Sequence, residues 1–292
     1  MTRLLGLDLG GTQIKGCIVE DDRVVGSASV DTTSADGPEA VLRRVVALGR
    51  ALASAHGEPS AAGLGLPGHF DADGAGVLLP NLAGEWVGRP IAGPVGDGLG
   101  LEVALINDVR AMTLAELRLG AGRGARDLVC VALGTGVGGG VVIDGRLHVG
   151  LGHAGEIGHV TVVADGPVCG CGNRGCLDRV AAAAAIASDA GTASVADAVA
   201  AARAGDARAR AALARAGRHV GLALAGAVVL LWPERIVVGG GVARAGDLIL
   251  GPLRAELRDR ARVAPVDRID VVPAELGAGA GAVGAALWAR EH

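Results

Sequence analysis

Three of the five cysteines in this 292-residue chain lie within eight positions of one another, in the stretch "GHVTVVADGPVCGCGNRGC". They are Cys169, Cys171 and Cys176, and His159 precedes the first of them by ten positions. Thiolates and an imidazole that meet in a fold can hold a metal ion. Clustered thiols can instead carry out redox chemistry, although thioredoxin-type sites use C-x-x-C and this cluster begins with C-x-C. The spacing alone leaves both chemistries open.

Two glycine-rich stretches, "LGLDLGGTQIKG" and "VALGTGVGGG", have the residue types of phosphate-binding loops. In each, an apolar strand leads into a turn whose glycines let several backbone N–H groups point at one anion, and a threonine hydroxyl adds a donor. Asp8, just before the first turn, has the chemistry to hold Mg²⁺ directly or through water. Two ordinary tight hairpins with a buried acid are the alternative. The residues predicted to bind nucleotide phosphates are Gly10, Gly11, Thr12, Lys15, Gly134, Thr135, Gly136 and Gly138.

Two further glycine patterns allow other interpretations. Gly134 to Gly139 matches the dinucleotide fingerprint G-x-G-x-x-G, but that fingerprint requires a helix to begin inside the loop, and this loop leads into the β-branched "VVIDG". The pattern therefore disfavours a dinucleotide site. Later in the chain, Gly240 and Gly241 in "RIVVGGGV" permit the close backbone approach that suits a flat adenine. Close packing of helices is the alternative there.

An internal repeat positions the two glycine loops. A shift of 124 positions aligns "LDLGGTQIKGCIVEDDRVVG" (7–26) with "VALGTGVGGGVVIDGRLHVG" (131–150), with three glycines and the apolar residues between them matching. Each copy predicts a strand, a glycine turn, a strand, a polar turn and a third strand. Helix and strand patterns alternate after both copies, with helices expected at 38–55, 109–120, 181–231, 245–262 and after the final "GAGAG". We therefore expect two α/β domains that arose by duplication.

The overall composition argues against several kinds of partner. A formal charge of −4 and a pI near 6.0 disfavour nucleic acid or an anionic membrane as the main partner. The longest apolar run, Val220 to Trp232, has 13 residues and is shorter than the ~20 needed to span a bilayer, and "MTRLLGLDLGGT" does not resemble a signal peptide. A cytoplasmic protein is expected. Thiols stay reduced in that compartment, so the clustered cysteines are expected to be metal ligands or catalytic groups rather than disulfides.

Taken in order, "LGLDLGGTQIKG", "LPGHFD", "PNLAGEW", "LINDVRA", "VALGTGVGGG", "GEIGHV" and "CGCGNRGCLD" resemble the motifs of the ROK family of bacterial glucokinases, other sugar kinases and sugar-responsive repressors. The resemblance spans positions 4 to 286. It implies the actin-like, ribonuclease-H-like ATPase fold, with two duplicated α/β domains and an interdomain cleft. The implied N-terminal domain covers 1–120 and is joined by the C-terminal helix 280–292, and the C-terminal domain covers 121–279.

The resemblance also implies roles for individual residues. His159, Cys169, Cys171 and Cys176 match the four ligands of a structural Zn²⁺ that orders the sugar-binding loop. Asp108, in "INDVRA", matches the catalytic base, and a plain helix N-cap is the alternative role for it. The positions that match the family's sugar-binding residues are Asn81, Asn107, Asp108, Glu156, His159 and Asp178, and the adenosine-binding turns correspond to Gly240 and Gly241.

The function implied by the resemblance is phosphorylation of a hexose by ATP and Mg²⁺, most simply glucose to glucose 6-phosphate. Asp178 stands where the family has a glutamate, and "NDVR" replaces "NDAN", so N-acetylmannosamine, mannose, allose and fructose stay open as the sugar. Polyphosphate is an alternative phosphoryl donor. A noncatalytic sugar-sensing protein is a further alternative, although a repressor would need a helix-turn-helix before the first loop. The resemblance implies a homodimer or homotetramer.

Overall fold

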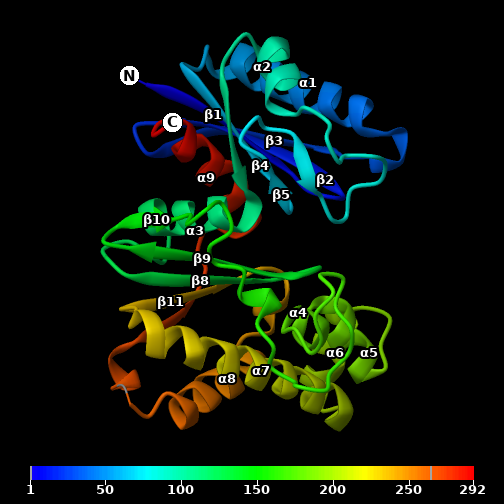
Figure 1. Ribbon diagram of the computed structural model, residues 1–292, viewed down its shortest axis with the longest axis vertical. Helices are drawn as coiled ribbons and strands as arrows, with labels where there is room; N and C mark the ends of the chain where they lie inside the picture. Colours follow the sequence, from blue (N-terminus) through cyan, green and yellow to red (C-terminus); the bar gives the residue numbers. More distant parts are fainter. Residues whose placement is uncertain (1, 264) are drawn as a thin grey trace. The chain divides into compact units, whose positions relative to one another are not determined.

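The computed structural model describes residues 2–263 and 265–292. Contacts within the chain divide it into two compact units, Met1–Gly120 with Leu276–His292, and Ala121–Glu275. The last helix, α9 (Ala280–Ala289), lies with the strands of the first unit (Figure 1). The first unit is therefore discontinuous in sequence, because the chain returns to it after completing the second.

A five-stranded sheet in the order β3-β2-β1-β4-β7 forms the centre of the first unit. Its strands are β1 (Arg3–Leu9), β2 (Gln13–Glu20), β3 (Arg23–Asp31), β4 (Ala61–Leu66) and β7 (Val103–Asn107). β1, β2 and β3 pair antiparallel, and β4 and β7 continue the sheet parallel to β1. The other elements are α1 (Pro38–His56), α2 (Ala92–Leu99), α3 (Asp108–Leu119), α9, a hairpin of β5 (His69–Phe70) and β6 (Gly76–Leu78), and 3-10 turns at Ser34–Asp36 and Gly277–Gly279.

Glycines in these strands let α9 pack closely on one face of the sheet. A Cβ on Gly6 would lie 1.9 Å from the carbonyl oxygen of Ala282, so only glycine fits there. Successive side chains of a strand point to opposite faces. Leu5 and Leu7 accordingly pack on the other side, against Gly49 of α1. A core of small and aliphatic residues, nearly free of aromatic rings, is thus closed by short helix-to-sheet distances.

The second unit repeats this plan with the strand order β10-β9-β8-β11-β12. Its strands are β8 (Leu128–Leu133), β9 (Val137–Ile143), β10 (Arg146–His148), β11 (Arg235–Gly239) and β12 (Asp270–Pro273). The first three pair antiparallel, and β11 and β12 run parallel to β8. The prediction of two α/β halves with one strand plan is confirmed.

The Ala- and Arg-rich segment 181–231 is helical, as predicted, but it divides into successive helices. They are α5 (Ala183–Ala190), α6 (Val195–Arg203) and α7 (Ala207–Leu231), after a short α4 (Asp178–Ala181). The Ser194 hydroxyl caps α6 by accepting from the Asp197 N–H, and Asp206 caps α7 by accepting from the Ala209 N–H. The remaining elements are α8 (Asp247–Arg260) and 3-10 turns at Ile157–His159, Val242–Ala245 and Val266–Arg268.

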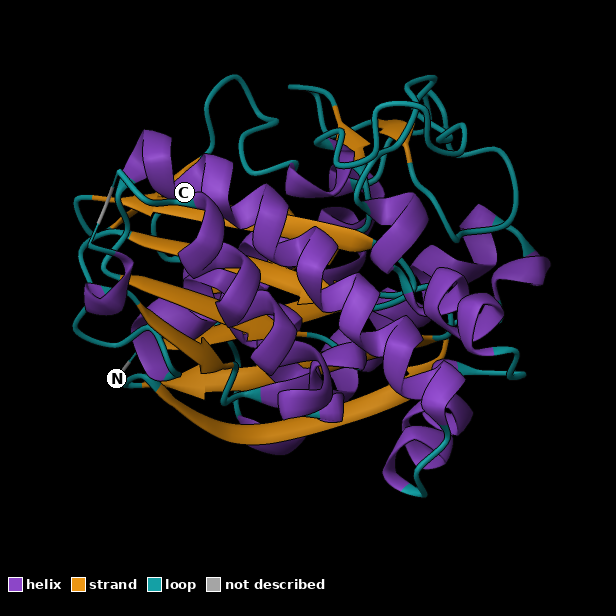
Figure 2. Cartoon of the chain, turned by 90° about the horizontal axis from the view of Figure 1, so that it is seen from below, coloured by secondary structure: helices purple, strands orange, loops and turns teal. Residues whose placement is uncertain are grey.

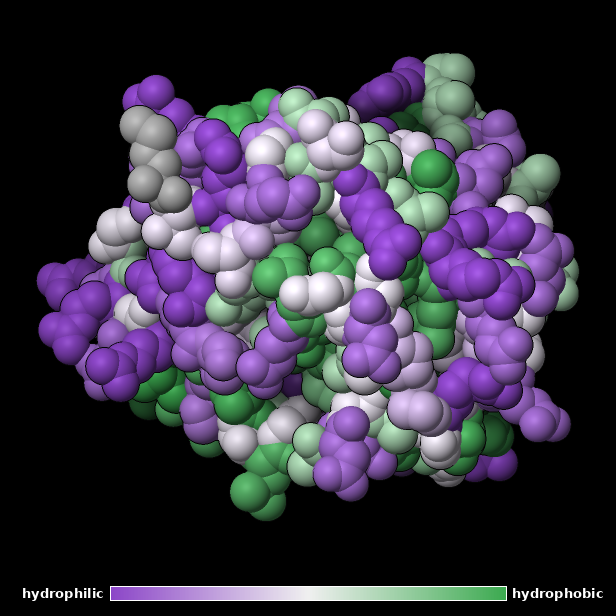
Figure 3. Space-filling view, turned by 90° about the horizontal axis from the view of Figure 1, so that it is seen from above, coloured by the Kyte–Doolittle hydropathy of each residue, from purple (hydrophilic) through white to green (hydrophobic). Residues whose placement is uncertain are grey.

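Helix α7 is the core helix of the second unit. It is long and apolar enough to cross a membrane by length and composition, and half of its most apolar 18-residue window is buried inside the structure. Its buried side chains join the strands and α8 in one hydrophobic cluster. Helices of the second unit lie in front of its strands in the view from below (Figure 2). On the face seen from above, apolar residues that reach the surface are mixed with polar ones (Figure 3).

Candidate functional site

The carboxyl ends of three parallel strands bring the predicted residues of the first unit to one sheet edge. β1 ends at Leu9, directly before the Gly10–Thr12 loop, β4 ends at Leu66, and β7 ends at Asn107, directly before Asp108. The register pairs Asp8 with Gly65 and Leu66 with Asn107, so the strand ends are level. Ligands of open α/β sheets bind at this edge.

The first glycine loop is held in place by neighbours far away in sequence. The Thr32 hydroxyl, which is fully buried, donates to the Gly10 carbonyl oxygen at 2.6 Å. A Cβ on Gly11 would lie 2.6 Å from the carbonyl oxygen of Asn81, whose backbone adopts a left-handed conformation with φ 68°. The turn that carries Asn81 therefore packs directly on the first loop. Thr32 escaped the sequence analysis, since a threonine after a strand gives no distinctive signal.

Asp8 carries a desolvated carboxyl group at the end of β1. Burial raises its pKa to about 6, and the opposing charge of Lys15, its cross-strand neighbour, lowers it only in part. A Cβ on Gly281, in the first turn of α9, would lie 2.6 Å from Oδ2 of Asp8. A carboxylate with incomplete solvation gains from a cation, so the chemistry of Asp8 fits Mg²⁺ binding.

Asn107, rather than Asp108, is the N-cap of α3. Its Oδ1 accepts from the backbone N–H groups of Val109 and Arg110 at 3.1 and 3.2 Å, and its Nδ2 donates to the Gly68 carbonyl oxygen at 3.2 Å. Asp108 is the half-buried first residue of the helix, and its Oδ1 accepts from the Val109 N–H at 2.8 Å. The cap role proposed as the alternative for Asp108 thus belongs to its neighbour, and the Asn107 side chain is engaged in holding that turn.

The second unit presents its glycine loop at the equivalent edge. β8 and β11 run parallel and end level, with Gly239 opposite Ala132. Gly240 has φ 86°, and a Cβ there would lie 2.2 Å from the carbonyl oxygen of Leu133. This close approach places Gly240 against the start of the second loop, whereas the adenine contact for which the sequence selected it stays a prediction. Gly241 begins the next 3-10 turn with open space around its Cα.

The four predicted zinc ligands come together in the second unit. One ligand atom from each of His159, Cys169, Cys171 and Cys176 lies within 4.8 Å of the other three. Nδ1 of His159 is 3.7 Å from Sγ of Cys169, and Sγ of Cys171 is 3.7 Å from Sγ of Cys176. Ligands about 2.3 Å from a tetrahedral Zn²⁺ lie about 3.8 Å apart. The donor set and its spacing therefore fit a structural zinc ion.

The thiols of this cluster differ in acidity. Burial raises the pKa of Cys176 to about 12, whereas a hydrogen bond from the backbone of Asn173 holds the pKa of the exposed Cys171 below its usual range. Only the thiolate ligates zinc, so metal binding must displace the proton of Cys176. Zinc affinity is therefore expected to rise with pH.

The predicted sugar-binding residues of the second unit lie next to its glycine loop. A Cβ on Gly158 would lie 1.9 Å from the carbonyl oxygen of Val137, so the segment with Glu156 and His159 packs on the start of β9. Oδ1 of Asp178 accepts a hydrogen bond from the Val137 backbone N–H at 2.8 Å. This bond ties a predicted sugar-binding acid to the predicted phosphate loop, and sequence reasoning gave no sign of it.

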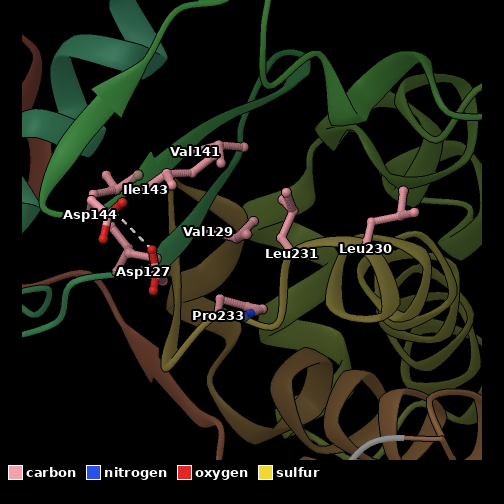
Figure 4. Close-up of a pocket in the computed structure, with 10 residues that line it drawn as sticks. Asp127, Val129, Val141, Ile143, Asp144, Leu230, Leu231 and Pro233 are labelled. Atoms are coloured by element: carbon pink, nitrogen blue, oxygen red, sulfur yellow. Dashed lines mark hydrogen bonds between the residues drawn. The ribbon is translucent and has the colours of Figure 1, made fainter.

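A pocket of about 310 Å³ lies elsewhere in the second unit (Figure 4). Val129, Leu230 and Leu231 are among its lining residues, and at its rim Asp127 accepts a hydrogen bond from the Asp144 N–H at 2.9 Å. β8 begins at this pocket and runs toward the second glycine loop. The pocket is therefore at the opposite end of the hairpin from the predicted phosphate contacts.

Known proteins resemble this chain over nearly its full length. The glucokinase of Thermotoga maritima is 36% identical over 311 residues, which cover 99% of this chain and 98% of that protein. A ROK hexokinase structure from Thermus thermophilus has a TM-score of 0.90 at 34% identity, with 99% and 98% of the two chains covered. A ROK family glucokinase from Streptomyces griseus, crystallised with glucose and AMPPNP, has a TM-score of 0.86 at 32% identity, with 99% and 100% covered.

These structural likenesses confirm the predicted actin-like ATPase fold with its two duplicated α/β halves. The family model of the ROK family matches residues 4–292 of this chain. The match therefore extends beyond the individual motifs to both units. The chain belongs to the ROK family.

Proposed function

We propose that the protein is an ATP-dependent sugar kinase that phosphorylates a hexose, with glucose converted to glucose 6-phosphate. The observation that carries the proposal is Asp108, which heads α3 at the same sheet edge as the first glycine loop. A carboxylate there can accept a proton from a bound hydroxyl, and glycine N–H groups can bind phosphate. The glucokinase and hexokinase relatives support this assignment.

The residues of the first unit would each serve one part of the transfer. Asp108 accepts the proton of the sugar hydroxyl while that oxygen bonds to the γ-phosphorus and the bond from this phosphorus to ADP breaks. Asn107 fixes the backbone of Asp108 through its three hydrogen bonds. Asn81, beside the first loop, donates to a sugar hydroxyl. Asp8 would hold the Mg²⁺ that neutralises phosphate charge.

The residues of the second unit would complete sugar and nucleotide binding. Glu156, Asp178 and Nε2 of His159 bind sugar hydroxyls, since Nδ1 of His159 faces the cysteine cluster. The four ligands of that cluster would hold a structural Zn²⁺, which keeps the sugar-binding loop in one conformation. The second glycine loop binds phosphate, and Gly240 and Gly241 approach the adenine.

One observation favours a sugar other than glucose as the second candidate. Asp178 is one methylene shorter than the glutamate expected there, and one of its oxygens is engaged by the Val137 N–H. Fewer acceptors then remain for the sugar, which weakens the assignment to glucose and leaves N-acetylmannosamine, mannose, allose and fructose open. Polyphosphate as donor, a cytoplasmic location and assembly as a homodimer or homotetramer stay predictions.

A coupled ADP-release assay with MgATP over a panel of hexoses and N-acetylhexosamines tests the proposal. We expect turnover on one sugar and at least a ~100-fold loss of kcat in Asp108→Asn with sugar binding retained, because a positioned base contributes ~10²–10⁴. Asp97→Asn, an exposed acid on α2, is the matched control. Absence of ADP release with every sugar, or near-normal turnover in Asp108→Asn, would contradict the proposal.

A further inference from the structure

The segment directly after the cysteine cluster is bonded to both ends of the second glycine loop. Asp178 accepts from the Val137 N–H at 2.8 Å, and the Ala183 N–H donates to the Gly134 carbonyl oxygen at 2.9 Å. Residues 134–137 are therefore held at both ends by hydrogen bonds from residues 178–183. The loop owes its position to that stretch as well as to its own hairpin.

The same stretch begins at a predicted zinc ligand. Cys176 and Asp178 are separated only by Leu177, whose side chain is fully buried and whose N–H donates to the Val160 carbonyl oxygen at 2.9 Å. The sulfur of Cys176 lies 3.6 Å from the carbonyl oxygen of His159. The position of the cysteine therefore fixes the position of the aspartate two residues later.

The two oxygens of Asp178 have different surroundings. Oδ1 receives the Val137 N–H, while Oδ2 has no hydrogen-bond partner within residues 2–263 and 265–292. A hydrogen bond to an ionised acceptor is about twice as strong as one between neutral groups, and it fixes the donor in direction. A carboxylate that holds the Val137 N–H, at the start of β9, thus restricts the conformations open to the preceding Thr135 and Gly136.

We propose that Asp178 is a positioning residue for the nucleotide, through which the zinc-binding segment sets the conformation of the second phosphate loop. The inference rests on the proposed kinase function and extends it. Zinc then governs nucleotide affinity as well as the order of the sugar-binding loop. Oδ2 remains available to a sugar hydroxyl while Oδ1 holds the Val137 N–H, so one side chain would serve both the sugar site and the phosphate loop.

Direct binding of AMPPNP and Mg²⁺, measured by calorimetry on the full chain with its zinc content determined, tests the inference. We expect Asp178→Ala to weaken AMPPNP binding about tenfold while retaining one zinc ion per chain, because a hydrogen bond to a charged group is lost. Asp178→Asn keeps an acceptor for the Val137 N–H and should stay within about threefold of the parent protein. Cys171→Ser should lose zinc and also bind AMPPNP about tenfold more weakly.

Asp165→Ala, an exposed acid between His159 and Cys169, is the matched control and should bind AMPPNP normally. Normal AMPPNP binding in Asp178→Ala with weakened sugar binding would overturn the inference and leave Asp178 as a sugar ligand only. Normal AMPPNP binding in zinc-free Cys171→Ser would overturn it too, as would equal losses in the Ala and Asn variants. Failure of the parent protein to bind AMPPNP would instead contradict the proposed kinase function.

Discussion

The two glycine loops come after equivalent strands of the two units, yet different groups hold them. The first loop is anchored by the neutral hydroxyl of Thr32 and by the turn at Asn81. The second is anchored by the carboxylate of Asp178 and by the Ala183 N–H. A duplicated hairpin thus supplies the shape of both loops, and later segments supply the contacts that make each loop specific.

The acids near the two loops differ in the same way. Asp8 lies within the first repeat and the equivalent residue of the second is Ala132, so the second loop receives its acid from outside the repeat. The carboxyl of Asp8 is desolvated and has a pKa near 6, whereas Asp178 is bonded to a backbone N–H. Asp8, rather than Asp178, is therefore the carboxylate that a bound cation would stabilise more.

Among the substitutions that test this difference between Asp8 and Asp178, the largest loss of activity is expected for Asp8→Asn. We expect kcat to fall at least ~100-fold, the usual loss when one preorganised electrostatic group is removed from a reacting centre. The amide keeps the shape of the side chain but loses the charge that would hold Mg²⁺. Steady-state turnover at several Mg²⁺ concentrations is the measurement, with Asp31→Asn on the exposed strand β3 as control. Unchanged kcat would remove Asp8 from cation binding.

The same substitution is expected to stabilise the fold. The pKa of Asp8 rises from 3.8 to about 6, so the folded state binds its proton more tightly than the unfolded state does, and stability falls as pH rises between these values. Above pH 6 Asp8→Asn should gain about 1–2 kcal/mol, less than the full pKa shift implies because the residue as a whole is only partly buried, and below pH 4 it should gain nothing. Urea denaturation at pH 4 and pH 7 measures this difference. A gain independent of pH would mean that the charge is not responsible.

The next effect concerns the turn packed against the second loop. Gly240→Ala places a Cβ 2.2 Å from the Leu133 carbonyl oxygen on a backbone with φ 86°, and we expect a loss of about 2–4 kcal/mol together with weaker AMPPNP binding. Gly241→Ala is the matched control, because its Cβ meets nothing within 4 Å and its φ is −62°. Denaturation of the two variants should separate them by at least ~1–2 kcal/mol. Equal stability would show that the turn can move away from the loop.

Sequence reasoning predicted the features that periodicity and spacing determine. The alternation of apolar residues and glycines around positions 7–26 and 131–150 specified both hairpins, since a strand's faces and its turns are local properties. The cluster from His159 to Cys176 indicated a site where four ligand atoms do approach one another. All of these features depend on residues near one another in the chain.

Contacts between distant segments escaped the sequence analysis. Asn107 and Asp108 are both good N-cap residues, and the structure shows that Asn107 is the cap, with its side chain also held by the distant Gly68 carbonyl oxygen. Asp178 and Val137 are 41 positions apart, so no local pattern relates them. The catalytic, sugar-binding and phosphate-binding roles also require substrate to be present, and they stay predictions.

The smallest predicted effect is the counterpart of Asp178→Ala in the first unit. Thr32→Val replaces a fully buried side chain by one of nearly the same shape that lacks the hydroxyl. The Gly10 carbonyl oxygen then loses the donor that lies 2.6 Å from it. We expect about 1–2 kcal/mol lower stability and AMPPNP binding weakened about threefold, less than for Asp178→Ala because the lost bond is between neutral groups. Calorimetry with AMPPNP and urea denaturation provide the two values.

Two controls separate anchoring of the loop from general loosening of the unit. Thr32→Ser keeps the hydroxyl and should restore AMPPNP binding. Thr113→Val removes an equally buried hydroxyl, bonded at 2.7 Å to the Val109 carbonyl oxygen within α3, and should lower stability without changing AMPPNP affinity. A loss in Thr32→Val as large as that in Asp178→Ala would mean that charge contributes nothing to the second anchor. The contrast between the two loops would then reduce to two hydrogen bonds of equal strength.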